Sequence, residues 1–485
     1  MNAKELISSL SDYRCEQSLD NIKIDQIEMD HRLLKSNSLF ICIKGYTVDG
    51  HQFAEAAVEN GASLIVAEKE LDVSVPVVIV PDSSRALAQL STHFYGHSSN
   101  QLKVIGVTGT NGKTSVTHMI NEIHQYVKQK TALIGTIEMV IDKESYPVKN
   151  TTPDSLYLQK SFHKMVEKDI DVVSMEISSH ALDLGRTNGV DVDIAVFTNL
   201  SQDHLDYHET MESYLYAKSL LFSQLGSSLK NEKPKYAIIN QDDEHAAFLK
   251  RVTAQPIFTY GIHEKASFQA IDVELRANGV SFTMRTPKGD VSINSKLMGM
   301  FSVYNLLAAA AASFASGIDL ETIQTVLNNT SGVKGRFQPV EHSQGFGVII
   351  DYAHTPDSLE NVLSTIKRFC EGDIHVIIGC GGDRDRRKRP LMANVACEYA
   401  DHAILTSDNP RSESPQAIID DMVEGIKYNN YQVVLDREEA IKHAIKQAGD
   451  KDVILIAGKG HETYQIVGDE VLDFDDEQIA RKYLV

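Results

Sequence analysis

A glycine- and threonine-rich turn joins an apolar run to a helical pattern early in this 485-residue chain. The run KVIGV is followed by TGTNGKTS, from Thr108 to Ser115, and then by VTHMINEIH. A strict phosphate-binding loop has a glycine five positions before its Gly-Lys pair, whereas here that position is Val107. Gly109 and Gly112 still allow backbone N–H groups to converge, and the start of a helix favours anions. The segment therefore indicates a strand, an anion-binding turn and a helix.

Two side chains of this turn have the chemistry that a nucleotide requires. Lys113 can reach terminal phosphate groups, and the Thr114 hydroxyl can hold Mg²⁺. The alternative is a glycine-rich turn with a surface lysine. Because the turn lies between a strand-like and a helical pattern, nucleotide binding is the better interpretation.

Short apolar runs alternate with helical patterns along the whole chain, in three blocks. A chain of this length is expected to form about two to four domains. We expect a small N-terminal α/β domain at 1–98, a central domain with a doubly wound, mostly parallel sheet at 99–332, and a Rossmann-like C-terminal α/β domain at 333–485. The central domain would contain the phosphate-binding turn. The alanine-rich stretch YNLLAAAAASFASG, from Tyr304 to Gly317, predicts a tightly packed helix that ends at Gly317.

Charge and cysteine content argue against several classes of protein. Asp and Glu number 67 against 47 Lys and Arg, and the net charge of −20 makes nucleic acid an unfavourable partner. The longest run of small apolar residues is about half the ~20 residues that a membrane-spanning helix needs, and the N-terminal segment has no apolar core typical of a signal peptide. The five cysteines are scattered, as is typical of reduced thiols. We expect a cytoplasmic protein that does not insert into membranes.

Three side chains further along are candidates for metal or carboxylate chemistry. Glu176 ends an apolar run, where a carboxylate facing the phosphate-binding turn is a suitable Mg²⁺ ligand. The alternative for Glu176 is a solvated turn residue, and the alternative for His204 is a packed or surface histidine. Lys218 lies in SYLYAKSLLF, where the pattern alone favours a surface lysine whose stem covers apolar neighbours.

The order of these motifs resembles that of the Mur ligase family over nearly the whole chain. The similarity covers TGTNGKT, MEISSHALDLGR, NLSQDHLDYH, SYLYAKSLLF, KGRFQ, DYAHTPD and DNPR. Folylpolyglutamate synthetases have a similar phosphate-binding turn. The resemblance implies an ATP-dependent, amide-forming ligase of peptidoglycan stem-peptide synthesis that requires Mg²⁺. Such enzymes activate a carboxylate as an acyl phosphate, which an amine then attacks.

The resemblance also implies roles for individual residues. The implied catalytic residues are Lys113, Glu176, His204 and Lys218, the last as an N-carboxylated lysine. The implied Mg²⁺ ligands are Thr114, Glu176, His204 and Lys218. The implied ATP-binding residues are Gly109, Thr110, Asn111, Gly112, Lys113, Thr114, Ser115, Asn305, Arg336, Asp351 and His354.

Two further groups of residues are implied for the other substrates. The site for UDP-N-acetylmuramoyl-L-alanyl-D-glutamate would contain His31, Asn150, Thr151, Thr152, Ser178 and Arg186. The site for meso-2,6-diaminopimelate would contain Arg384, Asp408, Asn409, Pro410, Arg411, Gly458 and Glu462. Within the family, DNPR resembles the signature of members that add diaminopimelate, whereas lysine-adding members differ at the arginine. Diaminopimelate carries a second carboxylate, which the planar guanidinium of Arg411 can bind with two parallel hydrogen bonds.

Four positions depart from the family pattern. His31 replaces a usual serine, Ser302 an asparagine, Gln338 a glutamate, and Leu184 a residue that is often polar. Three alternatives stay open beside the diaminopimelate-adding ligase: a lysine-adding relative, a nucleotide-regulated paralogue without ligase activity, and a folate-type polyglutamate ligase, which would lack the N-terminal block. We expect a monomer.

Overall fold

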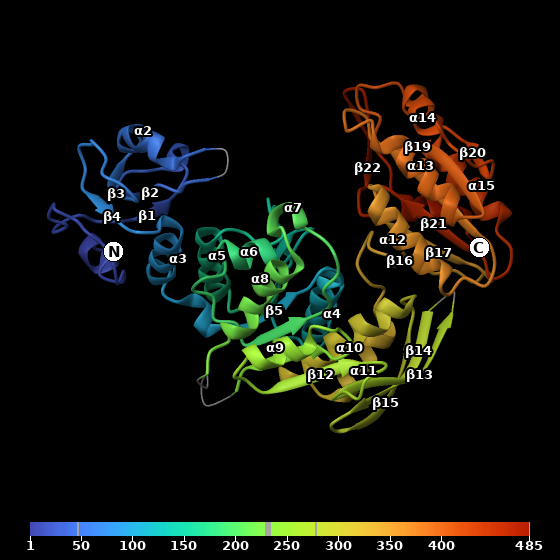
Figure 1. The fold of residues 1–485 in the computed structure, drawn as a ribbon, viewed down its shortest axis with the longest axis horizontal. Coiled ribbons are helices and arrows are strands. Elements are labelled where there is room, and N and C mark those ends of the chain that lie inside the picture. The colour runs from blue at the N-terminus through green and yellow to red at the C-terminus, as the bar shows by residue number, and fades with distance from the viewer. Residues whose placement is uncertain (46–47, 228–233, 277–278, 485) are drawn as a thin grey trace. The chain divides into compact units, whose positions relative to one another are not determined.

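The computed structural model describes residues 1–45, 48–227, 234–276 and 279–484. The chain forms two compact units. The first contains Met1–Thr259 and Ala311–Gly317, and the second contains Tyr260–Ala310 and Ile318–Val485. Figure 1 labels the helices and strands of both units.

The first unit begins with a small parallel sheet in the order β1-β2-β3-β4, blue in Figure 1. Strands β2, β3 and β4 are short apolar runs of the first block, and nearly every residue of β2 and β3 is buried, as is typical of parallel strands. Their bounds are β1 (Gln26–Glu28), β2 (Ser38–Ile41), β3 (Ala62–Ala67) and β4 (Val77–Ile79). The helices are α1 (Ala3–Ile7), α2 (Ala54–Glu59) and α3 (Ser83–Phe94), with short 3₁₀ turns at His31–Leu33, Gly50–Phe53 and Ser98–Gln101.

The larger sheet of the first unit has the order β11-β10-β5-β9-β6-β7-β8. The strands from β11 to β6 are parallel, and β7 and β8 extend the sheet in antiparallel fashion. The strands are β5 (Lys103–Thr108), β6 (Thr131–Ile134), β7 (Met139–Ile141), β8 (Glu144–Tyr146), β9 (Val172–Glu176), β10 (Ile194–Phe197) and β11 (Tyr236–Asn240). Because β9, β5 and β10 are parallel neighbours, the residues that follow them lie at one edge of the sheet.

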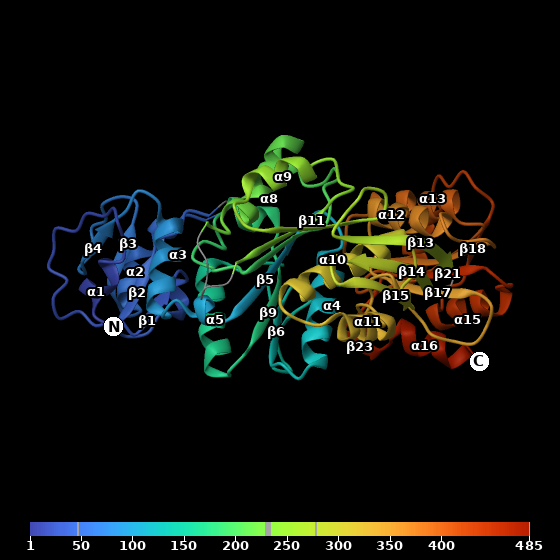
Figure 2. The same ribbon diagram turned by 90° about the horizontal axis from the view of Figure 1, so that it is seen from below.

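Helices connect these strands, as the alternating pattern predicts. They are α4 (Lys113–Tyr126), α5 (Ser155–Glu167), α6 (Ser179–Asp183), α7 (Leu205–His208), α8 (Met211–Ser223) and α9 (Ala246–Val252). Helix α5 packs against α3 of the small sheet, as Figure 2 also shows. Strand β12 (Ile257–Gly261) leads from the first unit into the second.

The second unit opens with an antiparallel meander and two helices. Its elements are β13 (Phe268–Arg276), β14 (Gly279–Thr286), β15 (Gly289–Ser295), the part of α10 (Met300–Ala315) up to Ala310, and α11 (Leu320–Asn329). The alanine-rich stretch forms most of α10, which ends at Ala315, and the alanines from Ala308 to Ala312 are fully buried. The prediction of a tightly packed helix there is confirmed.

The C-terminal sheet has the order β16-β17-β21-β18-β19-β20, with every pair parallel except β16 and β17. The strands are β16 (Gln338–Pro339), β17 (Gly347–Asp351), β18 (Ile374–Cys380), β19 (His402–Ser407), β20 (Tyr431–Val433) and β21 (Val453–Ala457). The helices are α12 (Pro356–Lys367), α13 (Lys388–Tyr399), α14 (Pro415–Val423), α15 (Arg437–Gln447) and α16 (Asp476–Tyr483). A hairpin of β22 (Tyr464–Val467) and β23 (Glu470–Asp473) follows β21. The predicted α/β architecture, with a small N-terminal sheet, a central mostly parallel sheet and a C-terminal mostly parallel sheet, is confirmed.

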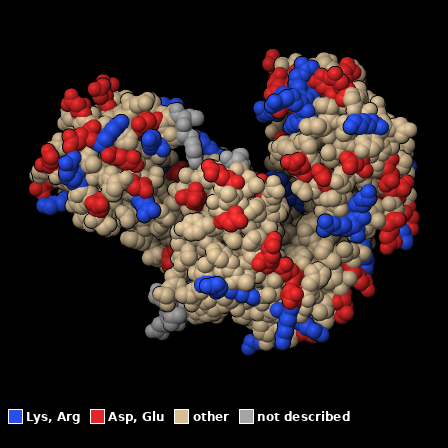
Figure 3. Space-filling view, viewed as in Figure 1, with Lys and Arg blue, Asp and Glu red and all other residues tan. Residues whose placement is uncertain are grey.

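The surface of each unit carries both signs of charge. On the face drawn in Figure 3, acidic side chains are spread among lysines and arginines. Among the described residues, no helix has both the length and the apolar character to cross a membrane. All five cysteines have free thiols.

Candidate active site

The turn after β5 has the backbone conformation that only its glycines adopt easily. Gly109 has φ of +147°, and a Cβ there would lie 1.8 Å from Thr198 Oγ1. Gly112 has φ of +84° and precedes the first residue of α4. The Thr110 N–H donates to the Asn199 carbonyl at 2.8 Å, which fixes the turn to the neighbouring loop after β10. The predicted strand, turn and helix are therefore present, and α4 begins directly after Gly112, where the helix dipole favours an anion.

Two lysines converge on one carbonyl oxygen of this turn. Lys113 Nζ donates to the carbonyls of Gly109, at 2.9 Å, and Thr110, at 2.8 Å. Lys218 Nζ from α8 donates to the same Gly109 oxygen at 2.8 Å. Burial, together with the nearby Lys113 charge, lowers the pKa of Lys218 well below its usual value. The interpretation of Lys218 as a surface lysine is wrong, because only 1% of the residue is exposed.

Glu176 ends β9 and lies against the same turn. The Thr114 hydroxyl donates to Glu176 Oε2 at 3.0 Å, while the N–H and hydroxyl of Thr136 donate to the two carboxylate oxygens at 2.8 and 3.1 Å. Glu176 is buried, so the interpretation as a solvated turn residue is wrong. Sequence reasoning missed Thr136, although a hydroxyl directly after the run TALIG was the available signal.

His204 lies in an aromatic cluster that reaches Lys218. It precedes α7 with φ of +53°, and its ring is about half exposed, 3.4 Å from Asp203. The ring lies edge-on to His180 at 4.9 Å and to Tyr214 at 6.1 Å between centroids. Lys218 Nζ lies 4.4 Å from the centre of the Tyr214 ring. His204 and Lys218 therefore share Tyr214 as a neighbour.

The donor set fits Mg²⁺ only together with nucleotide oxygens. Within the described part of the chain, no group of three or more His, Cys, Asp or Glu side chains is arranged to hold a metal ion. A hydroxyl and a carboxylate, Thr114 and Glu176, already lie 3.0 Å apart beside the phosphate-binding turn. Mg²⁺ commonly takes one or two protein oxygens, with phosphates and waters completing its shell. The residues present therefore fit a nucleotide-bound Mg²⁺.

The residues predicted for the muramoyl dipeptide surround the carboxyl end of β9. The Thr152 hydroxyl donates to the Glu176 carbonyl at 2.9 Å and accepts from the Ser178 N–H at 3.0 Å. Arg186 donates to the Thr152 carbonyl at 3.2 Å. Thr151 Oγ1 lies 3.1 Å from Thr136 Oγ1, so it connects to the Glu176 cluster.

Two other residues predicted for this substrate are not joined to that network by any contact among the described residues. Asn150 is exposed. His31, in the 3₁₀ turn of the small sheet, stacks on Phe53 at 4.6 Å between ring centroids. Leu184, one of the unusual positions, is 37% exposed at the end of α6, two residues before Arg186.

In the second unit, three of the residues predicted for ATP gather around Tyr352. Arg336 lies over the Tyr352 ring at 5.2 Å, and His354 lies 4.6 Å from it. Asp351, at the end of β17, accepts from the Phe337 and Ala353 N–H groups, and burial raises the pKa of its carboxyl.

Asn305, the fourth such residue, is buried in α10. Two departures from the family pattern have structural partners of their own. Gln338 accepts from the Gly335 N–H and donates to Glu477 Oε2, both at 2.7 Å. A glutamate at 338 would place two carboxylates together, so glutamine suits Glu477. The Ser302 hydroxyl donates to the Met298 carbonyl within its own helical turn.

The DNPR segment follows β19 and is fixed by the β22–β23 hairpin. The Arg411 N–H donates to the Ile466 carbonyl at 3.0 Å, and the Gly468 N–H donates to the Arg411 carbonyl at 2.7 Å. These bonds hold Arg411 at φ of +53°. Its guanidinium donates to the Gly382 carbonyl at 2.8 Å. Asp408 and Pro410 belong to the same segment. Gly458 lies so close to Asp408 that a Cβ on this glycine would be 2.9 Å from Asp408 Oδ2.

The loop after β21 meets this segment through Asn409. Asn409 Nδ2 donates to Glu462 Oε2 at 2.8 Å, and its Oδ1 accepts from the Ile466 N–H at 3.0 Å. The predicted diaminopimelate residues on these two loops are therefore brought together. Sequence reasoning missed Lys459, which is fully buried between them.

A buried arginine supports the third loop, which carries the exposed Arg384. Arg389 is fully buried and donates to both Glu413 oxygens, at 2.9 and 2.7 Å, and to Asp421 at 2.6 Å. The Asp383 N–H donates to Glu413 Oε1 at 2.6 Å. Arg389 is therefore not a solvated residue of a charged loop, because carboxylates of two other segments pair with it.

We expect Glu413→Gln to lower the free energy of unfolding by about 2 kcal/mol at neutral pH. The hydrogen bonds from Arg389 lower the pKa of the Glu413 carboxyl from 4.5 to about 2. The stabilisation is present above the unfolded-state pKa and is lost as the pH falls through the folded-state pKa. The difference from wild type should therefore shrink between about pH 4.5 and pH 2. Urea unfolding across this pH range measures the free energy of unfolding of both proteins, and exposed Glu424→Gln is the control. A difference between Glu413→Gln and wild type that does not change with pH contradicts the prediction.

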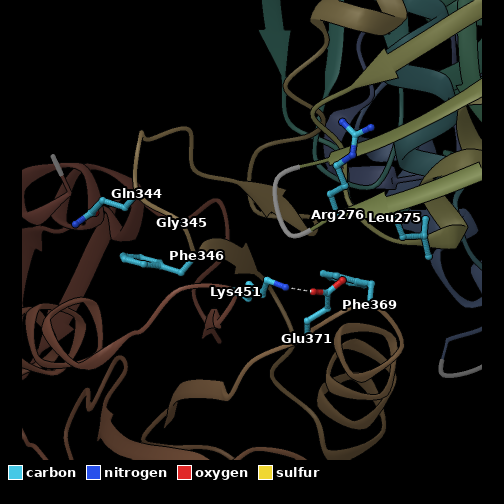
Figure 4. A pocket seen from close by; sticks show the side chains of 8 residues that line it. All are labelled: Leu275, Arg276, Gln344, Gly345, Phe346, Phe369, Glu371 and Lys451. Atoms are coloured by element: carbon cyan, nitrogen blue, oxygen red, sulfur yellow. Dashed lines mark hydrogen bonds and ion pairs between the residues drawn. The ribbon is translucent and has the colours of Figure 1, made fainter.

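A separate pocket lies at the other end of the C-terminal strands. It has a volume of about 230 Å³ and is lined by the last two residues of β13, Leu275 and Arg276, and by residues that precede β17, β18 and β21, among them Phe346, Glu371 and Lys451. Lys451 and Glu371 pair across it at 2.6 Å, as Figure 4 shows. None of the predicted site residues lines this pocket.

Comparison with known proteins agrees with this arrangement. Three family models match along the chain: "Mur ligase family, catalytic domain" at residues 23–95, "Mur ligase middle domain" at 107–313, and "Mur ligase, glutamate ligase domain" at 335–460. The UDP-N-acetylmuramoyl-L-alanyl-D-glutamate–2,6-diaminopimelate ligase of Bacillus velezensis is 55% identical, over 100% of this chain and 99% of its own.

The enzyme with the same name from Oceanobacillus iheyensis is 53% identical, over 99% of this chain and 98% of its own. A solved structure of a UDP-N-acetylmuramoyl-L-alanyl-D-glutamate–2,6-diaminopimelate ligase is 35% identical, with a TM-score of 0.75, and covers 99% of this chain and 98% of its own. Identity of this extent, together with the three matched domains, shows that the chain belongs to the Mur ligase family.

Proposed function

We propose that this protein is the ATP-dependent ligase that joins meso-2,6-diaminopimelate to UDP-N-acetylmuramoyl-L-alanyl-D-glutamate, a step of peptidoglycan precursor synthesis. The observation that carries the proposal is the convergence of Lys113 and Lys218 on Gly109 O, beside the Thr114–Glu176 pair. The shared name of the full-length relatives supports the choice of substrates.

The reaction needs several negative oxygens to approach one another. The side-chain carboxylate of the D-glutamyl residue attacks the terminal phosphorus of ATP, and ADP leaves with the bridging oxygen. The uncharged amine of diaminopimelate then attacks the acyl phosphate, so that the amide forms, phosphate leaves and a proton is released. Lys113 offsets the charge that builds up on the transferred phosphoryl group.

Mg²⁺ bound by Thr114, Glu176, His204 and Lys218 would supply further neutralisation of phosphate charge. The turn from Gly109 to Ser115 would hold the phosphates by its backbone N–H groups. Arg336, Asp351 and His354, which gather around the Tyr352 ring, are proposed to contact the nucleotide as well, as is Asn305 of α10.

Lys218 is proposed to carry an N-carboxyl group in the active enzyme. CO₂ reacts with an uncharged amine, and the lowered pKa of Lys218 makes this form available nearer to neutral pH than for an ordinary lysine. We expect the protein in ¹³C-labelled bicarbonate at pH 8 to show a carbamate signal from Lys218 by NMR, beside one from the N-terminal amine, which is also partly uncharged at this pH. Lys218→Met should remove one signal, and exposed Lys288→Met should keep both. A Lys218→Met spectrum that keeps every signal contradicts the assignment.

The muramoyl dipeptide is proposed to bind along Asn150, Thr151, Thr152, Ser178 and Arg186. Hydroxyl, amide and guanidinium donors suit its diphosphate and carboxylates. His31 and its stacked neighbour Phe53 would contribute from the N-terminal sheet. The junction of Thr152 with the Glu176 carbonyl would place the reacting carboxylate close to the phosphate-binding turn.

Diaminopimelate is proposed to bind between the loops that follow β18, β19 and β21. Arg411 would take its second carboxylate, and Arg384 would contribute a further guanidinium. Asp408 and Glu462 supply carboxylates for its ammonium groups, while Asn409, Pro410 and Gly458 would shape the loops.

We also propose that the protein is a monomer with domain boundaries near residues 98 and 332. We propose a cytoplasmic location, which the free thiols of the five cysteines support.

Phosphate release in the presence of all three substrates tests the proposed function. Release should require ATP, the muramoyl dipeptide and diaminopimelate together, with one ADP formed per amide. Omitting any one substrate should reduce the rate to background. A folded protein that releases no phosphate with the complete mixture would favour a paralogue without ligase activity.

A further inference from the structure

A fully buried lysine joins the two loops that are proposed to bind the amino acid. Lys459 lies directly after Gly458, and none of its surface is exposed. Its Nζ donates to Asn409 Oδ1 at 3.2 Å and to Glu462 Oε2 at 3.3 Å. The Tyr464 ring lies 5.5 Å from the same nitrogen. Lys459 thus contacts the loop after β19 and the loop after β21 at once.

These contacts give the Glu462 carboxylate a fixed direction. Both side-chain donors, Lys459 and Asn409, bind the same oxygen, Oε2. Within the described residues, the other oxygen, Oε1, has no hydrogen-bond partner, and 16% of the Glu462 side chain is exposed. One oxygen is therefore used to hold the side chain, while the other can accept from a ligand.

Burying an ammonium group costs free energy unless an opposite charge pairs with it, so the buried Lys459 needs a carboxylate partner. The wall of the site has a second buried cation, Arg437, which binds Asp476 through two hydrogen bonds of 2.8 and 2.7 Å and donates to the Ala457 carbonyl at 2.9 Å. Arg437 therefore has its own carboxylate, and Lys459 is the cation in direct contact with Glu462.

We propose that Lys459 is a positioning residue for amino-acid recognition, which orients Glu462 so that Oε1 accepts a hydrogen bond from an ammonium group of diaminopimelate. This inference rests on the proposed function. Lys459 acts through Glu462 and Asn409 and does not contact the reacting atoms. Its removal affects the binding of the amino acid and leaves the phosphate-binding turn of the first unit unchanged.

Lys459→Met keeps the volume of the side chain and removes the charge. We expect the KM for diaminopimelate to rise about 100-fold, as is typical when one partner of a buried charge pair is removed, while the KM for ATP changes less than about threefold. The matched control is Lys451→Met, whose lysine pairs with Glu371 on the surface. It should leave both KM values unchanged. Equal increases of the two KM values in Lys459→Met would overturn the proposal.

A double-mutant cycle with Glu462→Gln separates positioning from a general structural role. In the Glu462→Gln background, Lys459→Met should raise the KM for diaminopimelate by less than about threefold, because the carboxylate that it orients is gone. A 100-fold rise in both backgrounds would overturn the proposal.

The same double-mutant cycle also tests whether Lys459 positions Glu462 if Lys459→Met alone does not fold. The double variant removes both charges of the buried pair, and its KM for diaminopimelate should agree with that of Glu462→Gln. A higher KM in the double variant would contradict the inference. Phosphate release by the wild-type protein with diaminopimelate tests the proposed function separately, because that measurement uses no Lys459 variant.

Discussion

Lys113→Ala is expected to lower the rate of ATP-dependent phosphate release by at least about 10³-fold, which is the effect of removing a charged group that stabilises the transition state. Lys113 Nζ lies at the start of α4 and donates to two carbonyls of the phosphate-binding turn, at 2.9 and 2.8 Å. It is therefore held against the turn to which the phosphates are proposed to bind. The loss should appear in kcat, since the charge on the phosphoryl group grows as the transition state forms.

A surface lysine provides the matched control for this variant. Lys130 follows α4, and about half of its side chain is exposed. Lys130→Ala should keep wild-type activity, and the thermal midpoint Tm of Lys113→Ala should stay close to that of wild type. If Lys113→Ala kept a tenth or more of the wild-type rate, the lysine of the phosphate-binding turn would not be needed for catalysis, which would contradict the proposed mechanism.

Arg411→Lys is expected to lower kcat/KM for diaminopimelate by about 10³- to 10⁴-fold, because a site built for a hydrogen-bonding group loses its partner. The backbone of Arg411 is fixed by the Ile466 carbonyl and the Gly468 N–H, and its guanidinium already has one bond to Gly382 O. Lysine keeps the charge but cannot form two parallel hydrogen bonds with a carboxylate. The activity with L-lysine, which we expect to be low in the wild-type enzyme, should change little, so the preference for diaminopimelate should fall.

Arg387→Lys is the control for this substitution. Arg387 belongs to a neighbouring loop, is 90% exposed and pairs with Asp385 at 2.9 Å. It should not alter the preference between the two amino acids. If Arg411→Lys reduced kcat/KM equally for diaminopimelate and L-lysine, Arg411 would not be the residue that discriminates between them.

The parts of the site that follow strands could be predicted from the sequence, because local pattern determines them. The strand, turn and helix around Gly109 and Gly112 follow from an apolar run, two glycines and a helical period. The position of Glu176 at a strand end follows in the same way. Parallel neighbours then bring such ends to one edge of a sheet, so the main cluster could be expected.

Burial of polar side chains could not be predicted, because it depends on contacts between distant segments. The pattern around Lys218 favoured a surface position, yet its nitrogen reaches Gly109 O, 109 residues away in the chain. Arg389 and Lys459 are fully buried for the same kind of reason, as each meets carboxylates or amides of another loop. A single sequence shows the residue types at these positions. It does not show the tertiary partners that offset the free-energy cost of burying a charge.

The most direct test of the proposed function compares diaminopimelate with L-lysine as substrates of the wild-type enzyme. Purified protein is supplied with ATP, Mg²⁺ and the muramoyl dipeptide, and kcat/KM is measured by phosphate release for each amino acid, with the product mass as confirmation. We predict a kcat/KM for meso-diaminopimelate that exceeds that for L-lysine by at least about 10³-fold. An equal or greater value for L-lysine would contradict the assignment of the DNPR loop to diaminopimelate.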